Sequence, residues 1–279
     1  AMNEHLLDVG KLSQIQAPIG YLVYTGETPV FYQSNIPGER TKFEGEREKR
    51  SVTIHNARLL PNNFSLDVEG FAFTEHLTEV IDFYDDAEVA TVYEPEVETL
   101  ISQFTGASKV VVFDHTRRSS SQKVREKYNA RDPAGAAHTD YTDWSAQQRI
   151  KDVLPDEATY RLSRRFAIVN VWRSMTNTIQ EWPLALCDAR AINDDLLHTV
   201  ERRAYNRVGQ TRHASYDSGH IWHYFPQMQR TEVVLIKNYD TLIDGTARYS
   251  LHTAFEDPTS PVDAVPRESI ETRALVFFD

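Results

Sequence analysis

The stretch from Arg165 to Arg173 constrains the fold more than any other part of the chain, because its side chains alternate along the whole run. On a β-strand, neighbouring side chains point to opposite faces. One face would hold Phe166, Ile168, Asn170 and Trp172, and the other Ala167, Val169, Val171 and Arg173. Shorter strand-like runs separated by turn residues recur at 109–113, 183–188, 220–225, 232–237, 248–255 and 271–278. Many short strands and few helices predict a mainly β fold with flanking helices, a double-stranded β-helix or cupin-like jelly roll.

The length of the chain allows one large domain. With 279 residues and 41% hydrophobic content, it can bury an extensive core. We expect a single domain over residues 1–279, with the jelly-roll core over about 105–279 and the strands and helices of 1–104 packed on it. One of these helices is expected over 93–104, with Gly106 as its C-cap.

Composition limits the partners. The formal net charge is −11 and no Lys/Arg cluster dominates the sequence, so no nucleic-acid partner is expected. No apolar run approaches the length of about 18 residues that a membrane span needs, so no membrane association is expected either. Cys187 is the only cysteine, which excludes an intrachain disulfide and suits the reducing cytoplasm. The sequence leaves homo-oligomerisation open.

A candidate metal site begins at His138 and Asp140, an H-x-D pair in the run Ala137-His138-Thr139-Asp140-Tyr141. On a strand, residues i and i+2 share a face, so this imidazole and this carboxylate can bind one ion together. Adding one more histidine gives the two-His, one-carboxylate arrangement that binds Fe(II) and leaves positions open for O₂ and a co-substrate.

The third ligand has to come from later in the chain. We favour His252, on the late strand 248–255, because early and late strands of a jelly roll pair to close one mouth of the barrel. The main rival is His220. His220 and His223 are three residues apart, so at most one of them could point inward on a strand. The structural alternative for His252 is an ordinary buried histidine.

Two late arginines are candidates for binding a carboxylate. Arg273 precedes an apolar run, and a guanidinium there is costly to bury without an anion. Its planar shape suits the distal carboxylate of a co-substrate such as 2-oxoglutarate. Arg267, in a polar turn, is the second candidate. The alternative for both is a salt bridge to Glu268 or Glu271, and this alternative is stronger for Arg267.

The order His-x-Asp, late His, Arg resembles that of the Fe(II)/2-oxoglutarate-dependent oxygenases. More narrowly, the chain resembles the fungal and bacterial hydroxylase/desaturase family related to the cephamycin 7α-methoxylase component. The resemblance spans roughly residues 60–278. The matching stretches are 66–71, 105–107, 113–116, 137–141, 170–173, 183–188, 222–226, 239–240, 252–255 and 267–270. The chain departs from the family pattern at His223, where we expect an aromatic residue, and at Thr231, where we expect an acid.

The resemblance implies a dioxygenase that uses Fe(II), 2-oxoglutarate and O₂ to hydroxylate, desaturate or otherwise oxidise a C–H bond of a small natural product. Trp172, Arg173 and Trp222 are candidate substrate contacts, although aromatic residues on strands more often belong to the core. Two alternatives remain open at this point. One is a jelly-roll hydrolase or isomerase that uses Zn²⁺ or Mn²⁺ without redox chemistry. The other is a catalytically inactive jelly roll that binds a small molecule.

Overall fold

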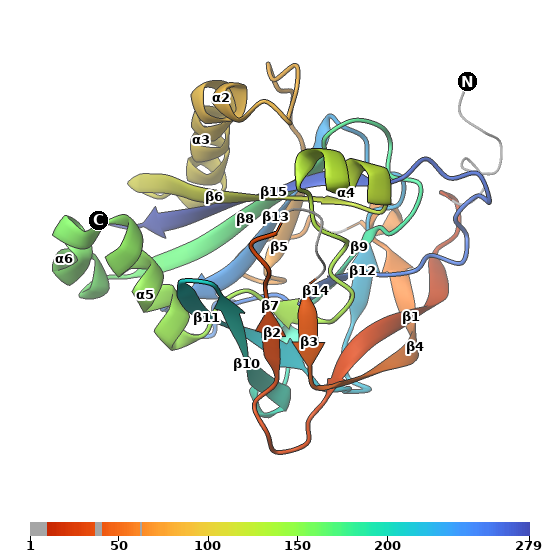
Figure 1. The fold of residues 1–279 in the computed structure, drawn as a ribbon, viewed down its shortest axis with the longest axis horizontal. Coiled ribbons are helices and arrows are strands. Elements are labelled where there is room, and N and C mark those ends of the chain that lie inside the picture. The colour runs from red at the N-terminus through yellow and green to blue at the C-terminus, as the bar shows by residue number, and fades with distance from the viewer. Residues whose placement is uncertain (1–9, 37–40, 62) are drawn as a thin grey trace.

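Two β-sheets form the framework of the protein, as a computed structural model shows (Figure 1). The structure describes residues 10–36, 41–61 and 63–279. The larger sheet has ten strands. In spatial order these are β1 (Gln14–Val23), β4 (Glu46–Asn56), β12 (Trp222–Tyr224), β9 (Leu184–Cys187), β14 (His252–Ala254), β7 (His138–Thr139), β11 (Arg207–Ala214), β10 (Leu197–Ala204), β2 (Val30–Tyr32) and β3 (Lys42–Glu44).

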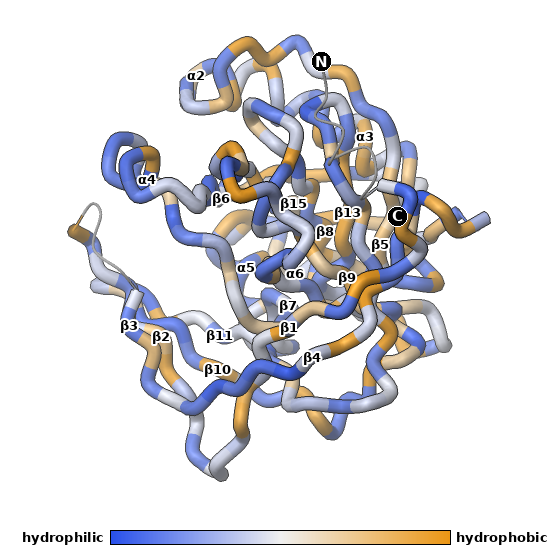
Figure 2. Tube along the Cα trace, turned by 90° about the vertical axis from the view of Figure 1, so that its right-hand side faces the viewer, coloured by the Kyte–Doolittle hydropathy of each residue, from blue (hydrophilic) through white to orange (hydrophobic). Residues whose placement is uncertain are grey.

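The smaller sheet has five strands and is the more deeply buried of the two. Its order is β5 (Phe71–Glu75), β13 (Glu232–Asp240), β8 (Phe166–Ser174), β15 (Glu268–Phe277) and β6 (Lys109–Ser119). Every residue of β8 is buried, and the neighbouring strands carry mainly hydrophobic residues (Figure 2). The alternation predicted for this strand is confirmed, because its two faces contribute to different hydrophobic clusters.

Helices pack on both faces of the smaller sheet. They are α2 (Asp86–Glu88), α3 (Glu94–Thr105), α4 (Gln122–Tyr128), α5 (Asp143–Val153) and α6 (Ala158–Leu162). Helices α5 and α6 pack with Phe166 and Ile168, on the face of β8 that turns toward the larger sheet. Helix α3 packs Val97, Leu100 and Ile101 against the outer face of the smaller sheet, over β6 and β15 (Figure 1). It ends at Thr105, and Gly106 caps it with a φ of 70°, as predicted. In the described part of the chain, no helix has the length and apolar character to span a membrane.

The inner faces of the two sheets meet in a shared core. One cluster joins Trp172 and Val234 of the smaller sheet to Leu184 and Leu186 of the larger one. The predicted jelly-roll class therefore agrees with the structure. The strands of residues 1–104 are hydrogen-bonded members of both sheets, so the expected division near residue 105 does not follow a boundary between sheets.

Candidate metal centre

His138 and His252 face each other on adjacent strands. The short strand β7 carries His138 and lies between β14 and β11 in the larger sheet. In the antiparallel pairing of β14 with β7, His252 is the direct partner of His138, and their ring centroids are 4.4 Å apart. Directly opposite residues are the closest neighbours across a sheet, so the register alone brings the early H-x-D pair next to the late histidine.

Asp140 completes this group. One nitrogen of each histidine and one oxygen of Asp140 all lie within 4.8 Å of one another. His138 Nε2 is 3.3 Å from Asp140 Oδ1, and His252 Nε2 is 3.9 Å from the same oxygen. Three donor atoms around one point, two imidazole nitrogens and one carboxylate oxygen, form the donor set of a two-His, one-carboxylate site.

The histidine nitrogens are arranged to accept a metal ion. His138 Nδ1 lies 2.7 Å from the carbonyl oxygen of Ala136, so Nδ1 carries the proton and the lone pair of Nε2 faces Asp140. His252 is 3% exposed, and neither of its ring nitrogens has a hydrogen-bond partner. Burial, together with the nearby His138, lowers the pKa of His252 to about 4, so the imidazole is neutral, as a ligand must be. A buried, unpartnered nitrogen next to two other donors fits a missing cation.

The two oxygens of Asp140 have different surroundings. Oδ2 accepts hydrogen bonds from Arg273 Nε at 2.9 Å and from Asn170 Nδ2 at 2.8 Å. Oδ1 instead faces the two histidines. Burial alone would raise the pKa of Asp140, but Arg273 and the two histidines outweigh it and hold the pKa well below its usual value. The carboxylate is thus ionised and oriented with one oxygen available.

Arg273 is already neutralised by carboxylates. Beside its bond to Asp140, its Nη1 donates to Asp114 Oδ1 at 3.0 Å and to Thr116 Oγ1 at 2.7 Å, and its Nη2 lies 3.3 Å from Glu271 Oε2. These acids raise its pKa further despite burial. The salt-bridge alternative therefore applies to Arg273, and its contacts do not support the expectation that it binds a co-substrate carboxylate.

Arg267 has the opposite environment. It is 2% exposed, its Nε donates to Ser269 Oγ at 3.1 Å, and its Nη1 donates to the carbonyl of Trp182 at 2.6 Å. No acidic side chain forms an ion pair with it among the residues described. Burial, and then the nearby Arg118, lower its pKa to about 9. A guanidinium that is buried without a counter-ion is costly, and a bound anion would remove that cost.

The backbone that supports Arg267 is also unusual. Trp182, whose carbonyl accepts the bond from Arg267, has a φ of 50°. Residues other than glycine seldom adopt this left-handed conformation, and such residues gather at ligand sites. The guanidinium of Arg267 also lies 5.2 Å from the ring centroid of Trp172, which closes one side of the same region.

The other predicted site residues lie elsewhere. Arg173 is fully buried on the outer face of β8 and donates to His76 and to the carbonyl of Arg230. Trp222 is fully buried and donates to Tyr21 Oη, which also lies 2.8 Å from His220 Nδ1. His223 packs against aromatic rings. The structure therefore brings neither Arg173 nor Trp222 to the metal centre, because the first faces α3 and the second belongs to the core.

Three residues near the centre were not predicted from the sequence as site residues. Asn170 donates to both Asp140 and Glu271, and Asn238 Oδ1 accepts the backbone N–H of Asp140 at 2.9 Å. Glu271 Oε1 lies 3.8 Å from His252 Nε2. Asn170 and Asn238 each interrupt an otherwise apolar buried strand, which is a signal for a hydrogen-bonded polar group.

A cavity opens beside the centre. Asp140 and Arg273 form part of its wall, and the space in front of them measures about 750 Å³ when the open solvent at its mouth is counted. A second space of about 730 Å³, open solvent included, reaches His138 and shares Arg131, Arg202 and Thr211 with the first. The carboxylate and the first histidine of the centre are thus accessible to small molecules from outside.

A jelly roll with two histidines, one carboxylate and an adjoining cavity is the arrangement typical of non-haem Fe(II) oxygenases. Comparison with known proteins identifies the family within this class. The family described as YDMC, "Oxidoreductase/YMDC permease-like domain", matches residues 19–277. "Hydroxylase/desaturase CTB9" of Cercospora beticola is 36% identical over 83% of this chain and 78% of its own length. "Fe(II)/2-oxoglutarate-dependent dioxygenase nvfI" of Aspergillus novofumigatus is 35% identical over 81% of this chain and 82% of its own.

The solved structures agree. The structure titled "iron and alpha-ketoglutarate-dependent endoperoxidase NvfI" superposes with a TM-score of 0.83 and 30% identity, over 95% of this chain and 98% of that one. The chain belongs to the Fe(II)/2-oxoglutarate-dependent dioxygenases, in the hydroxylase/desaturase family of fungal secondary metabolism. It is therefore an oxidoreductase whose cofactors are Fe(II), 2-oxoglutarate and O₂, which sets aside both the non-redox metalloenzyme and the inactive binding protein.

Proposed function

We propose that this dioxygenase holds Fe(II) through His138 Nε2, Asp140 Oδ1 and His252 Nε2. The observation that carries the assignment is the meeting of these three donor atoms within 4.8 Å. The unpartnered nitrogens of the buried His252 support it, because a buried polar atom without a partner is rare in a folded protein. His220 is not favoured, because it is not part of this group of donor atoms and lies instead beside Tyr21, with which its Nδ1 is paired.

We propose Arg267, rather than Arg273, as the anchor for the distal carboxylate of 2-oxoglutarate. Arg267 is buried and has no acidic partner among the described residues, whereas Arg273 contacts three carboxylates. Ser269, near the start of β15, accepts a hydrogen bond from Arg267 Nε and offers a hydroxyl to the same anion. Trp172 covers the guanidinium and helps to keep water out of the region.

When bound, Fe(II) with 2-oxoglutarate and O₂ supplies the oxidising power to remove hydrogen from an unreactive C–H bond, with release of succinate and CO₂. The protein contributes position and electrostatics. Arg273 and Asn170 hold Asp140 Oδ2, so that Oδ1 keeps one orientation. The carbonyl of Ala136 fixes the proton of His138 on Nδ1.

The substrate is a small natural product. The relatives are named hydroxylases, desaturases and an endoperoxidase, and we propose hydroxylation, desaturation or a related C–H oxidation for this chain. The narrower relationship to the cephamycin 7α-methoxylase component is also proposed, on the matching stretches around His138, Asn170 and His252. We further propose a cytoplasmic enzyme of one domain, in keeping with its single cysteine; homo-oligomerisation remains open.

The test is to add Fe(II) and 2-oxoglutarate under nitrogen and to solve the structure, and then to admit O₂ and measure succinate. The expected result is iron on His138, Asp140 and His252, the distal carboxylate of 2-oxoglutarate on Arg267, and succinate formed only with both additions. Iron on other residues would overturn the ligand assignment. A carboxylate bound to Arg273 would overturn the anchor assignment alone.

A further inference from the structure

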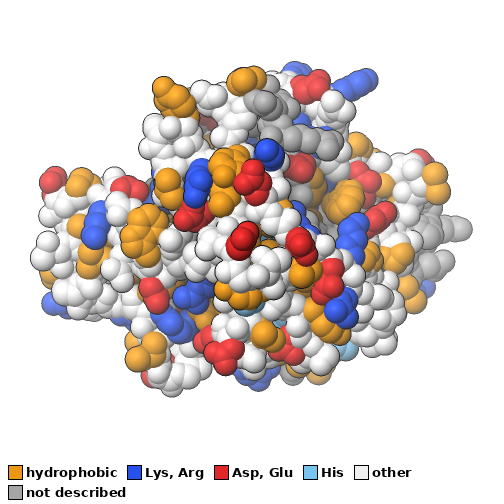
Figure 3. Space-filling view, turned by 60° about the horizontal axis from the view of Figure 1, so that its bottom comes forward, with side chains coloured by type: hydrophobic (Ala, Val, Ile, Leu, Met, Phe, Trp, Pro, Cys, Tyr) orange, Lys and Arg blue, Asp and Glu red, His pale blue; other side chains and the backbone are white. Residues whose placement is uncertain are grey.

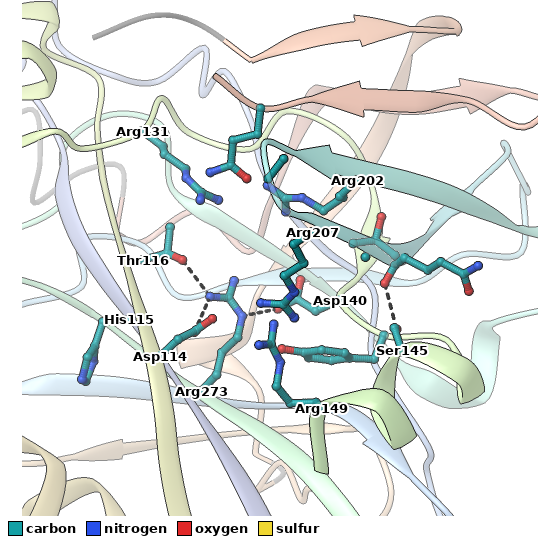
Figure 4. A pocket seen from close by; sticks show the side chains of 16 residues that line it. Asp114, His115, Thr116, Arg131, Asp140, Ser145, Arg149, Arg202, Arg207 and Arg273 are labelled. Atoms are coloured by element: carbon teal, nitrogen blue, oxygen red, sulfur yellow. Dashed lines mark hydrogen bonds and ion pairs between the residues drawn. The ribbon is translucent and has the colours of Figure 1, made fainter. Parts of the chain in front are cut away.

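Four arginines from four separate segments converge on the cavity next to Asp140. They are Arg131, which follows α4, Arg149 on α5, Arg202 on β10 and Arg207 at the start of β11, and together they form the arginine cluster. Figure 4 shows their side chains directed toward the space in front of Arg273 and Asp140. With Arg273, five arginines line this cavity against two aspartates, Asp114 and Asp140.

The cluster has no counter-ions of its own. Both aspartates of the cavity are already bonded to Arg273. Within the described part of the chain, no carboxylate forms an ion pair with any of the four arginines. Other arginines of the chain do have acidic partners, for example Arg203 with Glu201 at 2.8 Å and Arg58 with Glu232 at 2.7 Å. The cluster differs from these paired arginines in that four guanidinium groups, without an ion pair to any described residue, line one cavity.

The charge of the whole chain makes this arrangement more unusual. The chain carries 41 acidic residues against 30 Lys and Arg, so acids are available to neutralise arginines. On the face that Figure 3 shows, acidic and basic side chains are interspersed. In the cavity five arginines instead face only two aspartates, which concentrates a positive potential in this recess.

Holding these guanidiniums together has a cost. Burial, followed by the repulsion of Arg202 and Arg118, lowers the pKa of Arg131 to about 9. Burial and the same kind of repulsion lower the pKa of Arg202 to about 10. Arg149 Nε is buried and has no hydrogen-bond partner. Like charges that are partly desolvated destabilise the fold, and a bound anion would remove that cost.

We propose that the substrate of this dioxygenase is an acidic small molecule whose carboxylate or phosphate group binds the arginine cluster. The inference rests on the proposed function, because it places the reacting C–H bond at His138, Asp140 and His252. Asp140 lines the same cavity as the cluster, so one molecule can reach both. Guanidinium groups bind carboxylates and phosphates alike through paired hydrogen bonds, so either oxyanion meets the requirement.

This anion site is separate from the proposed co-substrate anchor. Arg267 does not line the cavity, and it is buried beside Trp172 and Trp182. One enzyme would then bind two anions: 2-oxoglutarate at Arg267 and the substrate at the cluster. Saturating the protein with 2-oxoglutarate fills the first site and leaves the second to be measured.

The test uses octylsuccinate and octyl phosphate as anionic probes, and dimethyl octylsuccinate as the neutral counterpart. Binding is measured by calorimetry under nitrogen, on protein that holds Fe(II) and saturating 2-oxoglutarate. The variants are Arg202→Gln and Arg149→Gln. The matched control is Arg203→Gln, which removes an exposed arginine from the same strand as Arg202 but outside the cavity.

We expect at least one anionic probe to bind, the neutral ester not to bind, and added salt to weaken the binding. Affinity should fall about tenfold or more in Arg202→Gln and Arg149→Gln, and should not change in Arg203→Gln. Which of the two probes binds better then distinguishes a carboxylate from a phosphate.

Equal binding of the ester, equal effects of the three variants, or binding of neither anion would overturn the proposal. Titrations with Fe(II) and with 2-oxoglutarate are run in parallel without a probe. Their failure would contradict the proposed metal centre, whereas normal titrations without probe binding would contradict the anion site alone.

Discussion

Arg273 Nε donates a hydrogen bond to Oδ2 of Asp140 at 2.9 Å, across 133 residues of sequence. The bond occupies the oxygen that faces away from the histidines and leaves Oδ1 beside them. Arg273 is thus a positioning residue for a metal ligand, and its charge keeps that ligand ionised. Groups that orient a metal ligand in this way change metal affinity when they are replaced.

Replacing Arg273 should weaken iron binding more than 2-oxoglutarate binding. Arg273→Gln leaves the buried carboxylates of Asp140 and Glu271 without their cation, so we expect Fe(II) affinity to fall about 10- to 100-fold. At saturating Fe(II), the dissociation constant of 2-oxoglutarate should change little. Anaerobic titrations of both ligands measure the two effects separately.

Because Arg273→Gln could also impair folding, Arg273→Lys serves as a second variant. It keeps the charge and loses the forked geometry, so it should restore part of the Fe(II) affinity. If iron binding were normal in both variants while the 2-oxoglutarate requirement rose, Arg273 would be the co-substrate anchor after all.

Arg267→Gln should show the reverse pattern. The loss of a buried pair between Arg267 and a carboxylate costs roughly 3–5 kcal/mol, so the 2-oxoglutarate concentration for half-maximal turnover should rise a hundredfold or more. Fe(II) affinity should stay close to that of the unchanged protein. Arg58→Gln, which removes an arginine paired with Glu232, is the control and should alter neither quantity.

Arg267→Gln should not lower the stability of the protein in the absence of 2-oxoglutarate. Without 2-oxoglutarate, Arg267 is a buried charge that no acid of the described chain neutralises. Removing it should therefore leave the thermal unfolding midpoint unchanged or raise it, whereas Arg273→Gln should lower it. A clear loss of stability in Arg267→Gln, measured by calorimetry, would mean that its two hydrogen bonds matter more than its charge.

The exchange of roles between these two arginines shows where sequence reasoning stops. Burial of Arg273 could be expected from the apolar run after it, and an anionic partner follows from burial. The identity of that partner could not be predicted from the sequence, because Asp114 and Asp140 are 159 and 133 residues away from Arg273 in the chain. The turn that contains Arg267 is polar in sequence, yet the Arg267 side chain is buried in the structure.

The strand pattern predicted the fold and the positions of the histidines better than it predicted the roles of the arginines. The spacing of His138 and Asp140 and the late position of His252 were visible, because a strand has a fixed period of two. The arginine cluster could not be predicted from the sequence, since its members come from four segments that meet only in the folded chain. Helix α4, capped by Ser121, also lies within a stretch that had the composition of a loop.

Iron titrations should decide whether His252 or His220 is the third metal ligand. We expect His138→Ala, Asp140→Ala and His252→Ala each to abolish tight Fe(II) binding, since each removes one of three proposed ligands. His220→Ala should retain it, because His220 is paired with Tyr21 and stacks on its ring. Retention of iron in His252→Ala together with its loss in His220→Ala would reverse the assignment.

His223 should make the protein sensitive to acid. Burial, and then the nearby His55, lower the pKa of His223 to about 4. The unfolded chain, with a pKa near 6.5, then binds more protons than the folded one as the pH falls. The stabilisation is complete above about pH 6.5 and is lost as the pH falls toward 4, by up to about 3 kcal/mol.

Replacing His223 with an apolar residue should reduce this dependence. His223→Phe supplies the aromatic residue that the family resemblance suggests at this position, and His223→Leu is a smaller alternative if the ring does not fit. Denaturant unfolding between pH 4 and 7.5 should give a flatter stability curve for these variants. A curve with the slope of the unchanged protein would assign the acid sensitivity to other groups.

Gly20 of β1 supports the segment that leads into the metal centre. A Cβ at this position would lie 2.0 Å from the carbonyl oxygen of Gly135, and the Gly20 carbonyl accepts the N–H of Ala137 at 2.9 Å. The segment beside it leads directly to His138 and includes Ala136, whose carbonyl fixes the His138 proton. Any side chain at Gly20 must therefore displace the backbone that orients His138.

We expect Gly20→Ala to cost about 1–3 kcal/mol of stability, as other overpacked sites do, and to lower Fe(II) affinity as well. Gly135→Ala is the matched control, because a Cβ there meets no atom within 4 Å and should change neither quantity. Thermal unfolding and anaerobic Fe(II) titration measure the two effects. If Gly20→Ala lost stability but bound iron normally, the segment before His138 could shift without moving the imidazole, and the ligand geometry would depend on the pairing of β7 with β14 alone.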